Sequence, residues 1–438
     1  MTGVLTLIPK QGDLRRLTNW RPICLLNTDY KIISKSLANR ISKVIHNIVS
    51  NDQTCCVPGR DIAENVLIMQ NMISYVNDNN LNGLALKIDQ YKAFDRVDHD
   101  YIFDVLHKFG FGPNFRKWVK ILYTDIYSCI KHNGFISESL PIQRGVRQGC
   151  PLSALLYVLS AEPFHEAIIN SDYISGIKFC ETEFRLFQHA DDTTFFVSSI
   201  TSIYSILKVI KLYERASGST CNIDKTELLA FGRARVTCDD FDFPVTRDYI
   251  KVLGIAIGNN TMVIENVNWK EKVKNCNLVL RRWKGRNLSF KGKSLIINSL
   301  VVSRLIYNIT ILPVPDWVIS SMRQSIIDFI WRGKKGPIKY ASLLLPFNKG
   351  GLNLRDIEIV RDSIRCKFIS KILDSSWNVN LRNIMLYFLN HYDNMSLGVS
   401  IFQTVPNKKS LLTIHPYYRE MLLAWKKITN GRLLEPLT

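Results

Sequence analysis

Several absences narrow what this 438-residue chain can be. Its ten cysteines include no Cys-x-x-Cys pair, which argues against both a disulfide framework and a zinc knuckle. No fixed-period repeat, low-complexity segment or long Gly/Ser-rich linker is present, so we expect contiguous, closely packed units. Residues 1–8 carry neither a basic leader nor a long apolar run, and we therefore expect an intracellular protein without a signal peptide.

A long uninterrupted apolar segment is also lacking. The most apolar stretch, residues 295–314, is broken by polar residues and a proline, namely Asn298, Ser299, Ser303, Arg304, Asn308 and Pro313. A membrane-spanning helix needs about 20 predominantly apolar residues. We therefore predict a buried helix here and no membrane partner.

Acidic residues are few relative to basic ones. The formal net charge is +19 and the isoelectric point about 9.4, while 46% of the residues are hydrophobic, enough for a sizeable core. Such an excess of Lys and Arg favours a polyanionic partner, and nucleic acid ranks above an acidic membrane.

The basic charge is concentrated in residues 270–293, where Glu271 is the one acid. A charge run is usually only a solvated helix face. Here Trp283 and Phe290 lie among the cations, a mixture suited to contacting phosphates while packing on sugars or bases. We predict that the nucleic-acid-binding residues are Arg281, Arg282, Lys284, Arg286, Lys291 and Lys293.

Asp191 and Asp192 are adjacent between two apolar, β-prone runs, residues 186–189 and 193–197. Such flanks predict a hairpin with both acids at its turn. Most Asp-Asp pairs are solvated turn residues or helix caps. Two carboxylates held between apolar strands nevertheless repel each other unless a cation is bound, and a divalent metal is the obvious candidate.

A third acid, Asp89, has a matching setting. The apolar run 84–88 predicts a strand that ends at Asp89, and apolar residues then recur at helical spacing from Phe94 to Phe109. Between the two acidic positions lies Arg144-Gly145-Val146-Arg147-Gln148-Gly149-Cys150-Pro151-Leu152-Ser153. Its glycines allow a close approach of the backbone to a ligand, although an ordinary loop before a helix would have the same composition.

With these segments in order, the chain resembles the reverse transcriptases of LINE-type (non-LTR) retrotransposons, whose signature comprises an AFD segment, RQGCPLS and an aromatic-ADD hairpin. Residues 19–60 look like the fingers region of that family, and residues 218–226 and 251–255 are similar to its last two palm motifs. The segments Gly292-Lys293, Phe329-Ile330-Trp331 and 350–354 resemble the region downstream. The resemblance covers essentially the whole chain.

The resemblance implies an α+β right-hand polymerase with fingers, a ferredoxin-like palm and a helical thumb. We place the fingers at residues 1–84 with a contribution from 110–150, the palm with the catalytic core at 85–262, the thumb at 263–345 and a helical C-terminal region at 346–438. The implied function is RNA-directed DNA polymerisation, with an RNA template, a DNA primer and deoxynucleoside triphosphates as partners. The oligomeric state and the cellular compartment are left open.

The same resemblance assigns the metal site. Asp89 and Asp191 would hold two Mg²⁺ ions, with Mn²⁺ as a substitute, and Asp192 would assist nearby. Two such ions promote in-line attack of a 3′-hydroxyl on an α-phosphate. Phe94 matches the steric gate that excludes a ribose 2′-hydroxyl.

Further positions follow from the motifs. Arg147 and Gln148 match residues that line the incoming nucleotide. Arg60 is a candidate for contact with the triphosphate, and its alternative role is that of a surface cation. Lys225 is a candidate proton donor to pyrophosphate, and its alternative role is that of a solvated turn residue. Lys251, Leu253 and Gly254 resemble the primer grip.

Two departures keep alternatives open. His189 stands where the family usually has Phe or Tyr, and we expect a packed, hydrogen-bonded imidazole rather than a metal ligand. No upstream endonuclease domain or downstream Cys/His knuckle is recognisable, so we expect a polymerase core. A catalytically silent nucleic-acid-binding relic remains the alternative. RQGCPLS disfavours a group II intron maturase, and Phe94 disfavours an RNA-dependent RNA polymerase.

Overall fold

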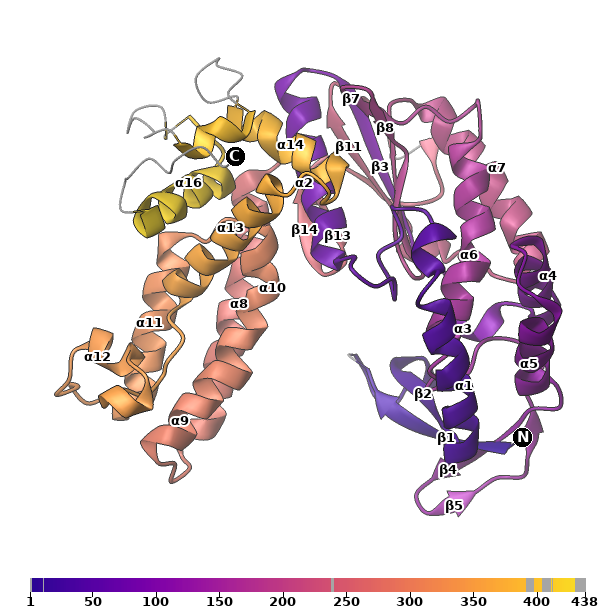
Figure 1. The fold of residues 1–438 in the computed structure, drawn as a ribbon, viewed down its shortest axis with the longest axis horizontal. Coiled ribbons are helices and arrows are strands. Elements are labelled where there is room, and N and C mark those ends of the chain that lie inside the picture. The colour runs from indigo at the N-terminus through magenta and orange to yellow at the C-terminus, as the bar shows by residue number, and fades with distance from the viewer. Residues whose placement is uncertain are drawn as a thin grey trace. The chain divides into compact units, whose positions relative to one another are not determined.

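The structure is a computed structural model that describes residues 2–10, 12–237, 240–390, 398–403, 411 and 413–429. It divides into two compact units (Figure 1). The first comprises residues 1–65 and 72–253, and the second comprises residues 66–71 and 254–438. The four-part division into fingers, palm, thumb and C-terminal region stays a prediction.

The first unit begins with an N-terminal sheet in which β1 pairs antiparallel with β2 and parallel with β4. The pairing with β4 brings a segment from beyond residue 110 beside the N-terminus. The strands of this sheet are β1 (Thr2–Pro9), β2 (Trp20–Leu25), β4 (Tyr127–His132), β5 (Phe135–Ile136) and β6 (Leu140–Pro141).

A second, central sheet has the strand order β12-β11-β3-β10-β9, and β3 pairs antiparallel with both β10 and β11. A separate hairpin, β7 (Ile177–Phe179) and β8 (Thr182–Phe184), lies outside it. The strands of the central sheet are β3 (Asn82–Ile88), β9 (Leu186–His189), β10 (Asp192–Val197), β11 (Glu227–Gly232) and β12 (Val245–Thr246).

Helices of the first unit cover the central sheet. The central sheet is covered on one face by α6 and α7: alternate residues Leu84, Leu86 and Ile88 of β3 share one apolar core with Phe164 of α6 and Ile206 of α7 (Figure 1). A mainly antiparallel sheet covered by helices confirms the predicted α+β class. The helices are α1 (Thr28–Ile41), α2 (Ile62–Asp78), α3 (Ala93–Arg96), α4 (His99–Lys108), α5 (Pro113–Tyr123), α6 (Ser153–Ile169) and α7 (Ile200–Ser217), with 3₁₀ turns at Leu17–Asn19, Ile45–Asn47 and Ile223–Lys225.

The boundary between the units falls between Leu253 and Gly254, in the turn that joins β13 (Tyr249–Val252) to β14 (Ile255–Gly258). Strand β14 belongs with the helices that follow because Asn268 bonds to it. The Asn268 Oδ1 accepts from the Ala256 amide at 2.8 Å, and its Nδ2 donates to the Ala256 carbonyl at 3.0 Å. The described part of the chain thus changes unit a few residues before the predicted boundary at 262.

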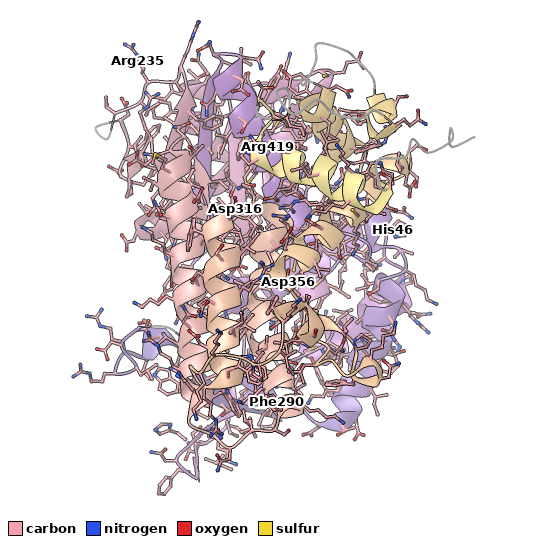
Figure 2. All side chains as sticks on the ribbon, turned by 90° about the vertical axis from the view of Figure 1, so that its left-hand side faces the viewer. His46, Arg235, Phe290, Asp316, Asp356 and Arg419 are labelled. Carbon is pink, nitrogen blue, oxygen red and sulfur yellow. The ribbon has the colours of Figure 1, made fainter. Side chains whose placement is uncertain are left out.

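After residue 260 the described chain is mainly helical, as predicted. Several helices begin with a side-chain cap. Asn260 accepts from the Val263 amide, and Asp356 accepts from the amides of Glu358 and Ile359; the labels Asp316 and Asp356 in Figure 2 lie at the starts of α11 and α13. The helices are α8 (Thr261–Lys284), α9 (Phe290–Ile296), a π-helical segment (Ile297–Val302), α10 (Ser303–Ile311), α11 (Asp316–Trp331), α12 (Tyr340–Leu344), α13 (Ile357–Leu373), α14 (Val379–Asn390) and α16 (Pro416–Thr429), with 3₁₀ turns at Phe347–Lys349 and Gly398–Gln403.

A buried arginine ties this helical unit together. Arg365 on α13 is fully buried, and its guanidinium donates to the Glu420 carboxylate at 2.7 Å and to the carbonyls of Ile309 and Leu312 at 2.7 Å each. The guanidinium carbon also lies 3.9 Å from the centre of the Tyr417 ring. The buried charge is therefore paired and its donors are used, as burial of a cation requires.

Most of the apolar stretch, up to Ile311, belongs to one continuous helix, Phe290–Ile311. By length and composition it could cross a membrane, which is weak support for a span because buried core helices pass the same test. Half of its most apolar window is buried inside the protein. The π-helical segment lies in the middle of this helix.

Candidate active site

The predicted acidic hairpin is confirmed. His189 of β9 pairs with Asp192 of β10, so Ala190 and Asp191 form a two-residue turn. Ala190 has a φ of +56°, a left-handed conformation that a residue with a Cβ seldom adopts. Such a strained position persists only when neighbouring contacts hold it.

Those contacts come from residues 52–54 and from α2. The Gln188 amide donates to the Asp52 carbonyl at 3.0 Å, and the Thr54 amide donates to the Gln188 carbonyl at 3.1 Å. Asn65 Nδ2 also reaches the Gln188 carbonyl, at 3.2 Å. The fully buried Gln53 accepts from the Ala190 amide at 3.0 Å through its Oε1. These residues could not be assigned this role from the sequence, because nothing in their local pattern marks a contact with a hairpin more than a hundred residues away.

We expect Gln53→Ala to loosen the acidic turn. The Gln53 Oε1 also accepts from the Cys55 amide at 2.9 Å, so truncation leaves two backbone donors without their acceptor. This should cost about 2–3 kcal/mol of unfolding free energy. Turnover should also fall because the Asp191 backbone is no longer fixed. Thermal unfolding and extension rates measure both effects; the exposed Gln143→Ala is the matched control, and equal behaviour of the two variants would contradict this role.

Asp89 lies beside the hairpin acids, at the end of the neighbouring strand; Asp89, Asp191 and Asp192 together are called the acidic edge below. Ile88 pairs with Thr193, so the next residues along the two antiparallel strands are Asp89 and Asp192. The Asp89 carboxylate accepts from Lys225 Nζ at 3.0 Å and from Asn222 Nδ2 at 3.4 Å. Lys225, the predicted proton donor, therefore lies beside the acids. Its exposed ammonium partly compensates the charge of Asp89.

The acidic edge is electrostatically strained. Burial, together with the nearby Asp192 and Asp89 carboxylates, raises the pKa of Asp191 to about 6. Burial and Asp89 likewise raise the pKa of Asp192. Three partly buried carboxylates close together suit a divalent cation, and carboxylate oxygens are the ligands Mg²⁺ prefers.

The glycine-containing loop, residues 144–153, forms backbone hydrogen bonds with two other segments of the chain. The Val146 amide donates to the Phe94 carbonyl at 2.7 Å, and the Cys24 amide donates to the Gln148 carbonyl at 2.7 Å. Gln148 Nε2 donates to Asp95 Oδ1 at 3.0 Å, which brings the predicted nucleotide residue beside the predicted gate. Asp95 itself was not singled out from the sequence.

Phe94 is held by a ring. It stacks on the buried Tyr157 with 4.4 Å between ring centres and 21° between planes. The Tyr157 hydroxyl donates to Gln90 Oε1 at 3.0 Å. Because Gln90 directly follows Asp89, the predicted gate residue Phe94 and the acidic edge share one support.

Arg147 and Arg60 make contacts within the protein that the sequence did not predict. Arg147 is only 5% exposed; it donates to the Tyr127 carbonyl at 2.9 Å and lies over the Tyr30 ring. Arg60 donates to four backbone carbonyls of residues 46–53, among them those of Val49 and Gln53 at 2.9 and 2.8 Å. Both guanidinium groups hold the chain, so their predicted contacts with nucleotide gain no support from this geometry.

Two other cations lie near the acidic edge. Arg21 on β2 acts on Asp191 by lowering its pKa, against the larger effect of burial. Burial raises the pKa of Asp95, while the Gln148 hydrogen bond, Lys92 and then Lys10 lower it. Lys10 and Arg21 are exposed at the end of the β1–β2 hairpin where the connecting loop joins the two strands. Arg21 belongs to the Trp20-Arg21-Pro22 segment of the fingers motif, and this motif could have indicated Arg21 as a site residue.

His189 packs as expected. Its Nδ1 lies 3.0 Å from Thr54 Oγ1, and burial lowers its pKa, which favours a neutral imidazole. The ring thus joins the contacts between the hairpin and residues 52–54.

The basic run is mostly exposed, with one correction. Arg281, Arg282, Lys284, Arg286 and Lys291 are exposed. Lys293 is 7% exposed; its ammonium donates to the Ile330 carbonyl and lies 5.4 Å from the Phe290 ring centre. Lys293 therefore stabilises the helical unit and does not belong to the exposed basic surface. Of the predicted primer-grip residues, Lys251 is exposed on β13, and Leu253 and Gly254, with φ of +49° and +83°, form the tight turn to β14.

Comparison with known proteins identifies the class. The family model described as reverse transcriptase (RNA-dependent DNA polymerase) matches residues 8–257, more than half of the chain. The chain therefore belongs to the reverse transcriptase family.

The relatives make the assignment narrower. The chain is 32% identical to the Transposon TX1 uncharacterized 149 kDa protein of Xenopus laevis, over 98% of this chain and 33% of that protein. It is 24% identical to the Retrovirus-related Pol polyprotein from type-1 retrotransposable element R2 of Popillia japonica, over 58% of this chain and 35% of that protein. Within the family the chain is of the LINE (non-LTR) type, which confirms the resemblance; it spans about a third of the length of these relatives.

Solved structures align over much of the chain at low identity. Telomerase from Candida albicans, solved with a fragment of telomeric RNA, aligns with 92% of this chain and 64% of its own, with a TM-score of 0.48 and 13% identity. The RNA-dependent RNA polymerase of a human picobirnavirus aligns over 76% of this chain and 56% of its own chain, with a TM-score of 0.41 and 12% identity.

Proposed function

We propose that this chain is an RNA-directed DNA polymerase that extends a DNA primer on an RNA template. The observation that carries the proposal is the acidic edge: Asp89 follows β3, and Asp191 and Asp192 lie at the end of the neighbouring hairpin. Family membership supplies the reaction class. The net charge of +19 suits the nucleic acid partners.

Asp89, Asp191 and Asp192 would hold the divalent ions, for which we propose two Mg²⁺. Bound there, the ions would activate the primer 3′-hydroxyl and stabilise charge on the α-phosphate and leaving group. Burial and the neighbouring carboxylates raise the pKa values of Asp191 and Asp192, so a bound cation would favour their ionised forms.

Other residues would position the nucleotide. Lys225 would release Asp89 when a cation binds and donate a proton to the departing pyrophosphate. Gln148 and Asp95 would define the floor of the sugar site beside Phe94. Lys10 and Arg21 are the fingers cations best placed for the triphosphate, since their charges act on Asp95 and Asp191. The β13–β14 turn would support the primer end.

Primer extension tests the proposal. Purified protein, an RNA template, a labelled DNA primer, deoxynucleoside triphosphates and Mg²⁺ should yield extended DNA. Salt-sensitive binding of template without any extension, in either Mg²⁺ or Mn²⁺, would contradict it and favour a silent nucleic-acid-binding protein.

Phe94→Ala should weaken discrimination against ribonucleotides. The Phe94 ring, held by Tyr157, would clash with a 2′-hydroxyl, and its removal opens that space. We expect the ratio of ribonucleotide to deoxynucleotide incorporation to rise by at least about tenfold, on the order of 1–3 kcal/mol. Competition assays with one template measure this ratio. Phe135→Ala, which truncates an 81% exposed ring, is the control, and an unchanged ratio in Phe94→Ala would remove the gate.

Arg21→Ala and Arg60→Ala should fail in different ways. Arg21 is exposed near Asp191, so its loss should raise the KM for deoxynucleotides about tenfold or more with little change in thermal stability. Arg60 binds backbone carbonyls, so its loss should lower the unfolding temperature instead. Steady-state kinetics and calorimetry on both variants separate the roles. A raised KM in Arg60→Ala without destabilisation would restore the original prediction for Arg60.

A further inference from the structure

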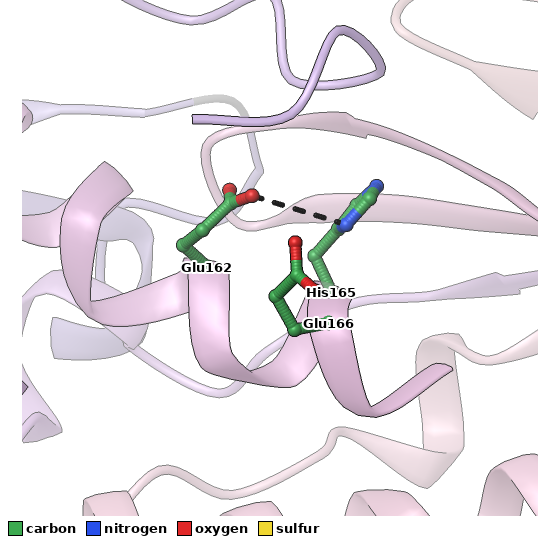
Figure 3. Close-up of side chains that lie close together, drawn as sticks. All are labelled: Glu162, His165 and Glu166. Carbon is green, nitrogen blue, oxygen red and sulfur yellow. Dashed lines mark ion pairs between the residues drawn. The ribbon is translucent and has the colours of Figure 1, made fainter. Parts of the chain in front are cut away.

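A second group of metal-binding side chains lies on α6, outside the acidic edge. Glu162, His165 and Glu166 are spaced so that they lie on one side of the helix (Figure 3). One potential ligand atom from each lies within 4.8 Å of the other two. Among the residues that the structure describes, no other three His, Cys, Asp or Glu side chains meet that spacing.

Two of the three side chains are buried with polar atoms unused. Glu162 is 2% exposed and His165 is 3% exposed. Within the described part of the chain, Glu162 Oε2 and His165 Nδ1 have no hydrogen-bond partner. A buried polar atom without a hydrogen-bond partner destabilises the fold unless a ligand satisfies it. The Nδ1 atom lies 3.9 Å from Glu162 Oε1, along the dashed line in Figure 3.

The outer atoms of both side chains are fixed by residues 50–52. Glu162 Oε1 accepts from the Ser50 amide at 2.8 Å and from the Ser50 hydroxyl. His165 Nε2 lies 3.1 Å from Asp52 Oδ2, and a carboxylate acceptor makes Nε2 the protonated nitrogen. That leaves a lone pair on Nδ1, directed to the Glu162 side. A carboxylate that orients an imidazole in this way is the usual outer support of a metal-binding histidine.

Glu166 completes the set from the solvent side. It is exposed, and its Oε2 accepts from Asn170 Nδ2 at 2.9 Å. An ion could therefore enter past Glu166 and meet the two buried side chains. One imidazole nitrogen and two carboxylates suit a divalent ion such as Zn²⁺ better than they suit Mg²⁺, which prefers oxygen ligands alone.

We propose that Glu162, His165 and Glu166 bind a Zn²⁺-like divalent cation that fastens α6 to residues 50–52. These residues lead into Gln53 and Thr54, which hold the turn of Asp191. The site would support the acidic edge structurally without touching the reactants. The competing account is a protonated His165 that forms ion pairs with Asp52 and Glu162, near the charge of Arg60.

Zn²⁺ titration of chelator-treated full-length protein tests the proposal. Excess Mg²⁺ occupies the acidic edge, and calorimetry reports binding without reference to polymerisation, so failure here is separate from failure of the proposed function. We expect one Zn²⁺ per chain. Glu166→Gln, an exposed change that leaves the core intact, should weaken Zn²⁺ binding by at least about tenfold, and Asp52→Asn by roughly 10- to 100-fold.

The matched control is Asp172→Asn, which removes an exposed acid just beyond α6 and should leave Zn²⁺ binding unchanged. Co²⁺ substituted for Zn²⁺ should give an absorption spectrum that changes in Glu166→Gln and not in Asp172→Asn. No stoichiometric Zn²⁺ binding in excess Mg²⁺, or equal Zn²⁺ affinity in wild type and Glu166→Gln, would overturn the proposal. In the first case, an imidazolium resonance for His165 would identify the ion pair instead.

Discussion

Asp191→Asn should eliminate nucleotide incorporation and, in the metal-free protein, raise thermal stability. The substitution removes a proposed ion ligand, and loss of several kcal/mol of transition-state stabilisation corresponds to a rate decrease on the order of a thousandfold or more. It also removes a carboxylate whose ionisation the fold disfavours. Burial, Asp192 and Asp89 hold the pKa of Asp191 at about 6, against an ordinary value of 3.8.

The pH dependence of this stabilisation follows from the raised pKa. Below about pH 4 Asp191 is protonated in both folded and unfolded chains, so asparagine changes little. Between about pH 4 and pH 6 Asp191 ionises in the unfolded chain but not in the folded chain, so the unfolding free energy of the wild type falls relative to that of Asp191→Asn. Above about pH 6 this difference in unfolding free energy is constant. Two pKa units correspond to about 3 kcal/mol, which solvent screening reduces to about 2 kcal/mol.

Calorimetry across this pH range, in the presence of a chelator, measures the effect. Asp172→Asn is again the control, since that acid is exposed. Added Mg²⁺ should stabilise the wild type more than Asp191→Asn, because a ligand that binds the folded state raises its stability. A metal-free Asp191→Asn protein that is less stable than wild type at pH 7 would show that Asp191 makes favourable contacts that the acidic edge does not predict.

Gly145→Ala should be among the most damaging single substitutions. A Cβ at Gly145 would lie 2.6 Å from the Asp95 Cα and carbonyl carbon, and its φ of +79° disfavours any side chain. Backbone atoms cannot yield as a flexible side chain can. We expect a loss of at least about 3 kcal/mol of unfolding free energy. The Gly145 amide donates to the Val97 carbonyl, and the Val146 amide donates to the Phe94 carbonyl. Because the substitution would displace these contacts beside Phe94, the KM for deoxynucleotides should also rise steeply.

Gly110→Ala separates the effect of backbone strain from that of a steric clash. Gly110 has nearly the same φ, +76°, but a Cβ there would meet no atom within 4 Å. Only the left-handed backbone is then penalised, at about 1 kcal/mol. Thermal unfolding of both variants gives the difference directly. If Gly145→Ala costs no more than Gly110→Ala, the loop does not pack against residue 95 as described.

The sequence was most informative where chemistry and local pattern coincide. The hairpin of Asp191 and Asp192 was predictable because apolar runs flank two charges that burial would otherwise exclude. Asp89 followed from a strand that ends in an acid, and the ordered motifs supplied the family. The helical second half followed from its periodicity, and its caps lie at ordinary capping residues such as Asn260 and Asp356.

The sequence was least informative about where charged side chains lie. Arg60, Arg147 and Lys293 have the same composition as ligand-binding cations, yet each is turned to backbone carbonyls inside the fold. Long side chains reach several ångströms, so their partners depend on tertiary contacts that no local pattern records. Gln53 and Asn65 were missed for the same reason.

The most direct measurement is the rate of first deoxynucleotide incorporation on a primed RNA template, for wild type and Asp191→Asn under identical Mg²⁺ and salt, with template binding measured in parallel. We predict incorporation by wild type, none detectable by Asp191→Asn, and similar RNA affinity for both. Equal incorporation rates in the two proteins, or binding without incorporation in the wild type, would contradict the assignment of the acidic edge as the polymerase active site.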